Sequence, residues 1–141
     1  MVGRNYNPWS IYQQIAPLIE NPLRNGSIQC YNMKNEIVIC SSNQICSLDF
    51  DQRGNKARSR GCVENSGARV SVYDGGSYSS FDIECNRHLC NSDETFQQIK
   101  TILIDYRLTD VNGRRIAAGT KQMISYCLMA LTLISLVVYY F

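Results

Sequence analysis

Cysteine spacing is the feature that most constrains this chain. Six of its seven cysteines lie between residues 30 and 91, and the last two, Cys85 and Cys90, enclose only four residues before Asn91. A spacing that short closes as a small disulfide loop. The seventh cysteine, Cys127, stands in an apolar tail and has no obvious partner. Six cysteines in so short a segment predict a disulfide framework, which persists in an oxidising compartment.

The size of the central segment explains why cross-links are needed. The chain has 141 residues, and without its polar start and its apolar end it leaves a unit of about 65 residues, for which a hydrophobic core alone is marginal. The net charge of +2 is too small to favour nucleic acid as a partner. The positive charge is nevertheless concentrated in one short stretch that contains Arg53, Lys56, Arg58 and Arg60.

Residues 1–27 contain all three prolines and only scattered apolar residues, which predicts a loosely structured leader. A secretory signal needs a continuous apolar run, and Ile11 to Ile19 is interrupted by Gln13, Gln14 and Pro17. The cysteines indicate the secretory route, so the start of the chain conflicts with them. Two explanations stay open, namely an incomplete N-terminus and membrane insertion directed by the tail.

A glycosylation sequon stands just ahead of the first cysteine. It consists of Asn25, Gly26 and Ser27. It predicts a glycan on Asn25 if the chain enters the secretory pathway.

Short β-branched segments alternate with turn residues between the cysteines. Paired segments separated by turn residues are typical of β-hairpins. The pattern predicts three hairpins, formed by residues 28–31 with 36–40, 44–50 with 57–63, and 70–73 with 78–83.

The cysteines and their neighbours follow a recognisable order, which is Cys-Tyr, then Cys-x5-Cys, then Arg-Gly-Cys, then Cys-x4-Cys-Asn. This order resembles the three-finger superfamily of lymphocyte-antigen and urokinase-receptor domains, which also contains snake toxins. The resemblance implies a small disulfide-rich all-β three-finger domain over residues 28–92. Two bridges common in the family are missing here, and Asn32 and Met33 stand where one of their cysteines would follow Tyr31.

The resemblance also implies how the cysteines pair. Six cysteines alone allow fifteen connectivities. The family pattern selects Cys30–Cys46, Cys40–Cys62 and Cys85–Cys90. It also implies that Asn91 has a structural role, holding the C-terminal loop to the core by hydrogen bonds.

The segment after Asn91 carries a helix signal. Ser92 is an N-cap candidate, acidic residues follow it, and the apolar positions have helical spacing; these positions are Phe96, Ile99, Ile102, Leu103 and Tyr106. A strand over residues 101–108 is the alternative. Residues 93–122 are therefore expected to form a stalk that packs on the domain, on a partner or on the membrane surface.

Residues 123–141 contain no charged side chain and are long enough to span a bilayer. A retained helix would place the preceding basic residues, Arg114, Arg115 and Lys121, in the cytosol, although the disulfide domain belongs outside. A glycolipid-anchor signal cleaved at Ala117 removes that conflict. The anchor and the transmembrane helix stay open as alternatives, and both attach the chain to the plasma membrane with its domain on the extracellular face.

Metal binding and catalysis find little support. The candidate ligands for a zinc ion are Cys40, Cys46, Cys85 and Cys90. The number of residues between the two cysteines of each pair is larger than is usual for zinc ligands. His88 is the only histidine, and no nucleophile and carboxylate converge on it in the sequence. The sequence predicts no cofactor, no metal and no enzymatic activity.

The basic turn of the second hairpin is the candidate for partner binding. Arg53, Lys56 and Arg58 are presented there on a rigid turn, and Tyr73 and Tyr78 of the third hairpin supply amphipathic contact area. The alternative is a solvated turn with two tyrosines on a strand face.

The resemblance implies a non-enzymatic membrane-anchored cell-surface protein that binds and modulates a receptor or ion channel. One alternative is a cell-adhesion or junction-assembly protein. Another is a tail-anchored structural membrane protein with reduced cysteines inside the cell. The oligomeric state stays open.

Overall fold

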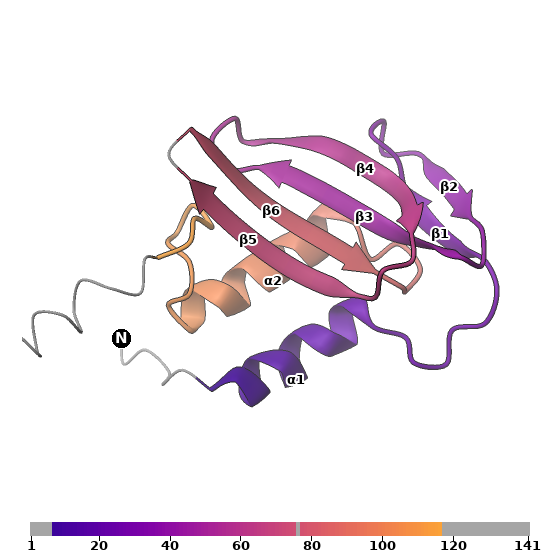
Figure 1. Cartoon of the computed structure of the whole chain (residues 1–141), viewed down its shortest axis with the longest axis horizontal. Coiled ribbons are helices and arrows are strands. Elements are labelled where there is room, and N and C mark those ends of the chain that lie inside the picture. The colour runs from indigo at the N-terminus through magenta and orange to yellow at the C-terminus, as the bar shows by residue number, and fades with distance from the viewer. Residues whose placement is uncertain (1–6, 76, 117–141) are drawn as a thin grey trace, which may run out of the picture.

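The computed structural model describes residues 7–75 and 77–116 (Figure 1). In chain order the elements are α1 (Pro8–Ile19), β1 (Ile28–Tyr31), β2 (Ile37–Cys40), β3 (Gln44–Asp51), β4 (Lys56–Glu64), β5 (Arg69–Gly75), β6 (Tyr78–Cys85) and α2 (Asp93–Asp105). The result is a small, β-rich, disulfide-linked fold.

The strands form three antiparallel hairpins in the predicted places. The first hairpin, β1–β2, is a two-stranded sheet. The second and third hairpins join into one four-stranded sheet in the order β4-β3-β6-β5, because β3 also pairs with β6. Three hairpins that extend from a cysteine cluster fit a three-finger-like arrangement.

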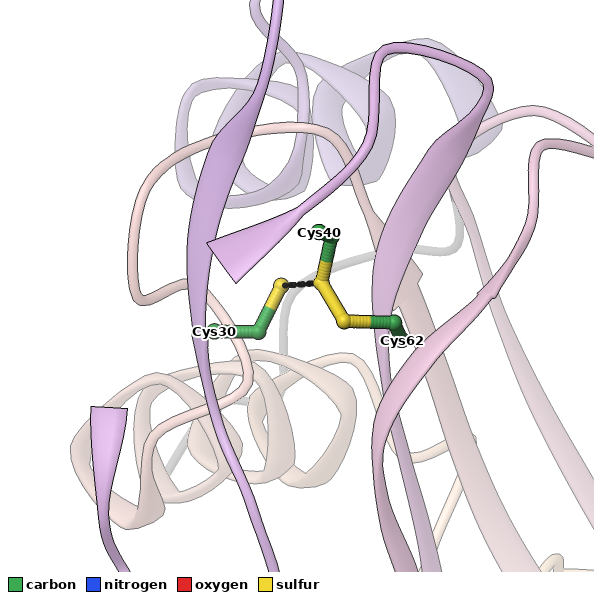
Figure 2. Close-up of side chains that lie close together, drawn as sticks. All are labelled: Cys30, Cys40 and Cys62. Carbon is green, nitrogen blue, oxygen red and sulfur yellow. Dashed lines mark hydrogen bonds between the residues drawn. A yellow bond between two sulfur atoms is a disulfide. The ribbon is translucent and has the colours of Figure 1, made fainter. Parts of the chain in front are cut away.

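The six cysteines form three disulfides, with the pairing that the resemblance implies: Cys30–Cys46, Cys40–Cys62 and Cys85–Cys90. The strand register places Cys46 opposite both Cys62 and Cys85. The Sγ atoms of Cys30 and Cys40 lie 3.0 Å apart although they belong to different disulfides (Figure 2). Each bridge is expected to contribute about 2–4 kcal/mol, which is large for a domain of this size.

Two helices cover one face of the four-stranded sheet (Figure 1). Alternate residues of β3 and β6 point toward the helices, and Leu48, Phe81 and Ile83 are at most 1% exposed. The ring of Phe96 on α2 packs edge-on against Phe81, with a centroid distance of 5.0 Å. The apolar side chains of the sheet and of both helices form one continuous core.

The prediction of a loosely structured leader is wrong for residues 8–19. Asn7 caps α1, since its side chain accepts from the backbone N–H groups of Trp9 and Ser10, and Pro8 occupies the first helical position, where no N–H is needed. The buried stripe consists of Ile11, Ile15 and Ile19. Pro17 lies in the last turn, where it removes only one backbone hydrogen bond.

The expectation of an all-β fold is corrected by the same helix and by α2. Ser92 caps α2 by accepting from Thr95 N–H at 3.1 Å, and Asp93 and Glu94 occupy the first turn. The strand alternative over residues 101–108 is therefore wrong. Residues 93–105 pack on the domain, which is one of the three placements that the sequence left open.

The helix α2 ends in a left-handed residue. Leu108 N–H donates to Leu103 O at 2.9 Å and Arg107 N–H donates to Ile104 O at 2.8 Å, the two bonds of a Schellman motif. Arg107 has a φ of 57° there. Among the described residues, no helix combines the length and the apolar character needed to cross a membrane. The predicted anchor site at Ala117 and the apolar tail lie outside the described residues.

Candidate functional site

Four of the five predicted partner-binding residues gather at one end of the four-stranded sheet, on the face opposite the helices. We call the set Arg53, Arg58, Tyr73 and Tyr78 the arginine–tyrosine patch. Arg53 lies in the turn between β3 and β4, Arg58 in β4, Tyr73 in β5 and Tyr78 at the start of β6. The pairing of β3 with β6 brings the second and third hairpins together, and this pairing creates the patch.

Arg58 owes its position to a β-bulge. Ser59 pairs with Asp49 while Ala57 pairs with Phe50, so Arg58 is the extra residue of β4. Bulges redirect a side chain and are over-represented near functional sites. Here the bulged side chain lies over β3 and reaches β6.

The guanidinium of Arg58 is held from two sides. Its Nε and Nη2 donate to Asp49 Oδ1 at 3.2 and 2.7 Å, and this contact with Asp49 is the main cause that raises the pKa of Arg58. Its carbon Cζ lies 4.1 Å from the centre of the Tyr78 ring, and the guanidinium also donates to the Tyr78 hydroxyl. Arg58 is therefore an ordered part of the patch, since it is fixed before any partner arrives.

Arg53 joins the tips of the second and third hairpins. Its Nη2 donates to Gly75 O at 3.1 Å and lies 3.4 Å from Asp74 Oδ1. The rings of Tyr73 and Tyr78 lie next to each other with a centroid distance of 5.7 Å. Tyr73 is 56% exposed and Tyr78 is 43% exposed, so the patch offers aromatic surface to the solvent.

Lys56 lies beside the patch and is not part of it. It is exposed at the first position of β4, opposite Asp51. The pKa of Asp51 is lowered, chiefly because its carboxylate accepts from the backbone of Gly54. The predicted basic tip is thus divided: Arg53 and Lys56 remain near the tip, whereas Arg58 lies on the sheet face.

Sequence reasoning missed two carboxylates beneath the patch. Asp49 on β3 and Asp82 on β6 are register partners, and burial, together with the neighbouring Asp49, raises the pKa of Asp82. Ser80 Oγ donates to Asp82 Oδ2 at 3.2 Å. The alternation of polar and apolar residues in both strands was the signal that placed these carboxylates on one face.

The other candidate residues are placed as follows. Asn25 is exposed in the segment before β1, where Gly26 adopts a φ of 89°. His88 is exposed, and its Nδ1 accepts from Gln29 N–H at 3.1 Å. Among the described residues, the only clusters of potential metal ligands consist of the disulfide cysteines, whose sulfur atoms are bonded to each other and offer no thiolate. Cys127 lies outside the described residues.

Comparison with known proteins gives no match. No protein-family model matches the chain, and no curated protein and no solved structure resembles it closely enough to count as a relative.

Proposed function

We propose that this chain is a membrane-anchored member of the three-finger superfamily that binds and modulates a receptor or ion channel, without enzymatic activity. It is attached to the extracellular face of the plasma membrane through its apolar tail, by a glycolipid at Ala117 or as a transmembrane helix. Three hairpins and three disulfides in the family's pairing support the domain assignment. The arginine–tyrosine patch is the observation that carries the binding function.

The patch has the properties of a protein-recognition surface. Tyrosine and arginine are enriched among the residues that dominate binding energy. Arg58 and Arg53 are held by Asp49 and Gly75 before a partner arrives, so little conformational entropy is lost on binding. Ordered guanidinium groups beside exposed tyrosine rings suit an acidic or aromatic loop of a partner protein.

The test uses exposed residues in and beside the patch, whose loss is expected to spare the fold. Arg53, Lys56 and Tyr73 are changed together to alanine, and Arg58 is kept because its loss would leave Asp49 and Asp82 without a cation. The variant is co-expressed with a candidate channel, and current and surface level are measured. We expect the wild-type effect to be lost while the amount of the variant at the cell surface stays the same.

A matched control removes positive charge elsewhere. Lys34 and Arg87 are exposed and lie away from the patch, and both are changed to alanine. This control is expected to modulate the channel as the wild type does. Equal modulation by the patch variant and by the control would refute the role of the patch.

Membrane attachment is tested separately. Intact mass of the cell-derived protein is measured before and after treatment with a phospholipase that cuts glycolipid anchors. A chain that ends near Ala117 and carries a glycolipid supports the anchor, and an intact Phe141 supports the transmembrane helix. Free thiols at the six cysteines would refute the extracellular assignment.

Homophilic adhesion is a second candidate function, favoured by the outer strand of the first hairpin. Ile37 and Ile39 on β2 are 54% and 73% exposed, and among the described residues β2 pairs only with β1. Open edge strands with apolar side chains pair readily with another chain. Aggregation of beads coated with the protein, abolished by Ile39→Lys, would support adhesion, and no aggregation would exclude it.

A further inference from the structure

An apolar groove of about 630 Å³ lies between α1, β5 and the segment that follows α2. Its walls include Ile11 and Ile15 from α1, Val70 and Val72 from β5, Leu103 from α2 and Ile116. This volume is within the range of about 300–1,000 Å³ that is typical of small-molecule sites. The groove lies on the helix side of the sheet, so it is separate from the arginine–tyrosine patch.

One polar group in the lining has no hydrogen-bond partner among the residues that the structure describes. Thr109 is 2% exposed and lines the groove, and its buried Oγ1 has no hydrogen-bond partner within residues 7–75 and 77–116. Buried hydroxyl groups are nearly always hydrogen-bonded, because an unpaired one costs free energy. An orphaned hydroxyl in an apolar groove indicates a ligand that carries a polar group to this point.

Two arginines stand at the rim. Arg107 and Arg115 both line the groove and are exposed, and within the described ranges no acidic side chain forms an ion pair with either. Arg107 also holds the left-handed position at the end of α2, for which glycine is preferred. Arg107 thus places a long, positively charged side chain at a backbone position that disfavours any residue with a Cβ atom.

We propose that this groove binds a long-chain amphiphile with an anionic head, such as a fatty acid. The hydrocarbon chain lies along the apolar walls, the head group pairs with Arg107 and Arg115, and the hydroxyl of Thr109 hydrogen-bonds to the head. Charge complementarity selects this occupant over the apolar tail of the same chain. Residues 117–141 contain no acidic side chain to meet the two arginines.

The test uses the full chain in nanodiscs of zwitterionic lipid. The probe is a fatty acid with a photoreactive diazirine near its methyl end, and the matched probe is the fatty alcohol of the same chain length. After irradiation, cross-linked peptides are mapped by mass spectrometry. We expect the acid to label peptides of α1 and β5, and the alcohol to label them about tenfold less, because a neutral head loses the charged hydrogen bonds.

Three variants locate the site. Arg107→Gln with Arg115→Gln is expected to reduce labelling by the acid about tenfold and to leave labelling by the alcohol unchanged. Val72→Trp fills the groove and is expected to abolish labelling by both probes. Thr109→Val removes the hydroxyl with almost no change in side-chain volume and is expected to reduce labelling by the acid. The control, Lys34→Gln with Arg87→Gln, removes two exposed charges elsewhere and is expected to label as the wild type does.

Disulfide mapping under non-reducing conditions shows that each variant has folded. Equal labelling by acid and alcohol, or labelling that the double arginine variant leaves unchanged, would overturn the proposal. It would also be overturned if the acid labelled residues 117–141 and not the groove peptides, because the fatty acid would then bind outside the groove. None of these results bears on channel modulation by the patch.

Discussion

Asn91 and Tyr31 are joined by two hydrogen bonds that imitate the pairing of two β-strands. Tyr31 N–H donates to Asn91 Oδ1 at 2.9 Å, and Asn91 Nδ2 donates back to Tyr31 O at 2.9 Å. The same Nδ2 also donates to Ser47 O at 2.9 Å. A fully buried amide thus connects the C-terminal disulfide loop to β1 and to β3, which is the structural role that the resemblance implies.

Replacing Asn91 by Asp is therefore expected to destabilise the fold. The change preserves side-chain size but removes the donors to Tyr31 O and Ser47 O, leaving buried carbonyl groups unpaired beside a buried carboxylate. We expect a loss of about 2–4 kcal/mol in the free energy of unfolding, measured by pulse proteolysis in urea. Asn112→Asp, at an exposed turn position, is the control, and an equal effect of both changes would contradict the role of Asn91.

The helix α1 is expected to contribute to stability. Ile19 is 4% exposed in the shared core, so Ile19→Ala is predicted to lower the free energy of unfolding by about 2–3 kcal/mol through lost burial and a cavity. Leu23 is 87% exposed, and Leu23→Ala is expected to change almost nothing. The same proteolysis assay compares them, and two equally small effects would mean that residues 8–19 do not pack on the sheet.

The left-handed position of Arg107 predicts a variant more stable than the wild type. Arg107→Gly relieves the steric cost of a Cβ atom at a φ of 57° and is expected to raise the free energy of unfolding by about 1 kcal/mol. Arg107→Ala keeps that cost and serves as the control. Thermal unfolding should rank glycine above both alanine and arginine, whereas equal stability of the glycine and alanine variants would contradict the backbone argument.

The raised pKa of Asp82 predicts that the free energy of unfolding falls as the pH rises. Burial and Asp49 raise the pKa of Asp82, so above the unfolded pKa the folded state holds its proton more tightly than the unfolded state does. The free energy of unfolding therefore decreases as the pH rises from the pKa of Asp82 in the unfolded state to its pKa in the folded state. Asp82→Asn should therefore raise the melting temperature at pH 7 and leave it nearly unchanged at pH 3.

Asp51 is expected to have the opposite effect on how the free energy of unfolding depends on pH. Its pKa is lowered, mainly by the backbone of Gly54, so its contribution to stability is present above the unfolded pKa and disappears as the pH falls through the folded pKa. Asp51→Asn should lower the melting temperature at pH 7 and not at low pH. Shifts of the same sign for the Asp51 and Asp82 variants would contradict both assignments.

The sequence was most informative where a local pattern decided the structure. Turn residues between β-branched segments placed all three hairpins, and the cap at Ser92 with its acidic first turn placed α2. The disulfide pairing required the family resemblance, because spacing alone leaves fifteen connectivities.

The errors arose where distant parts of the chain decide the structure. Pro17 and the two glutamines obscured α1, whose isoleucine stripe is stabilised by a sheet formed much later in the sequence. The contacts of Arg58 depend on a bulge and on the pairing of β3 with β6. No local pattern in the basic turn indicates either of these.

The contact between α1 and the end of α2 has a consequence for how the chain folds during synthesis. Ser10 Oγ lies 2.5 Å from the Tyr106 hydroxyl, and Gln14 Nε2 donates to that hydroxyl at 2.7 Å. The first helix emerges from the ribosome long before Tyr106 does, so it cannot reach its final contacts until nearly all of the described chain has been made. Contacts so distant in sequence slow folding. Until then the isoleucines of α1 lack their final contacts, so this segment is prone to aggregation during synthesis.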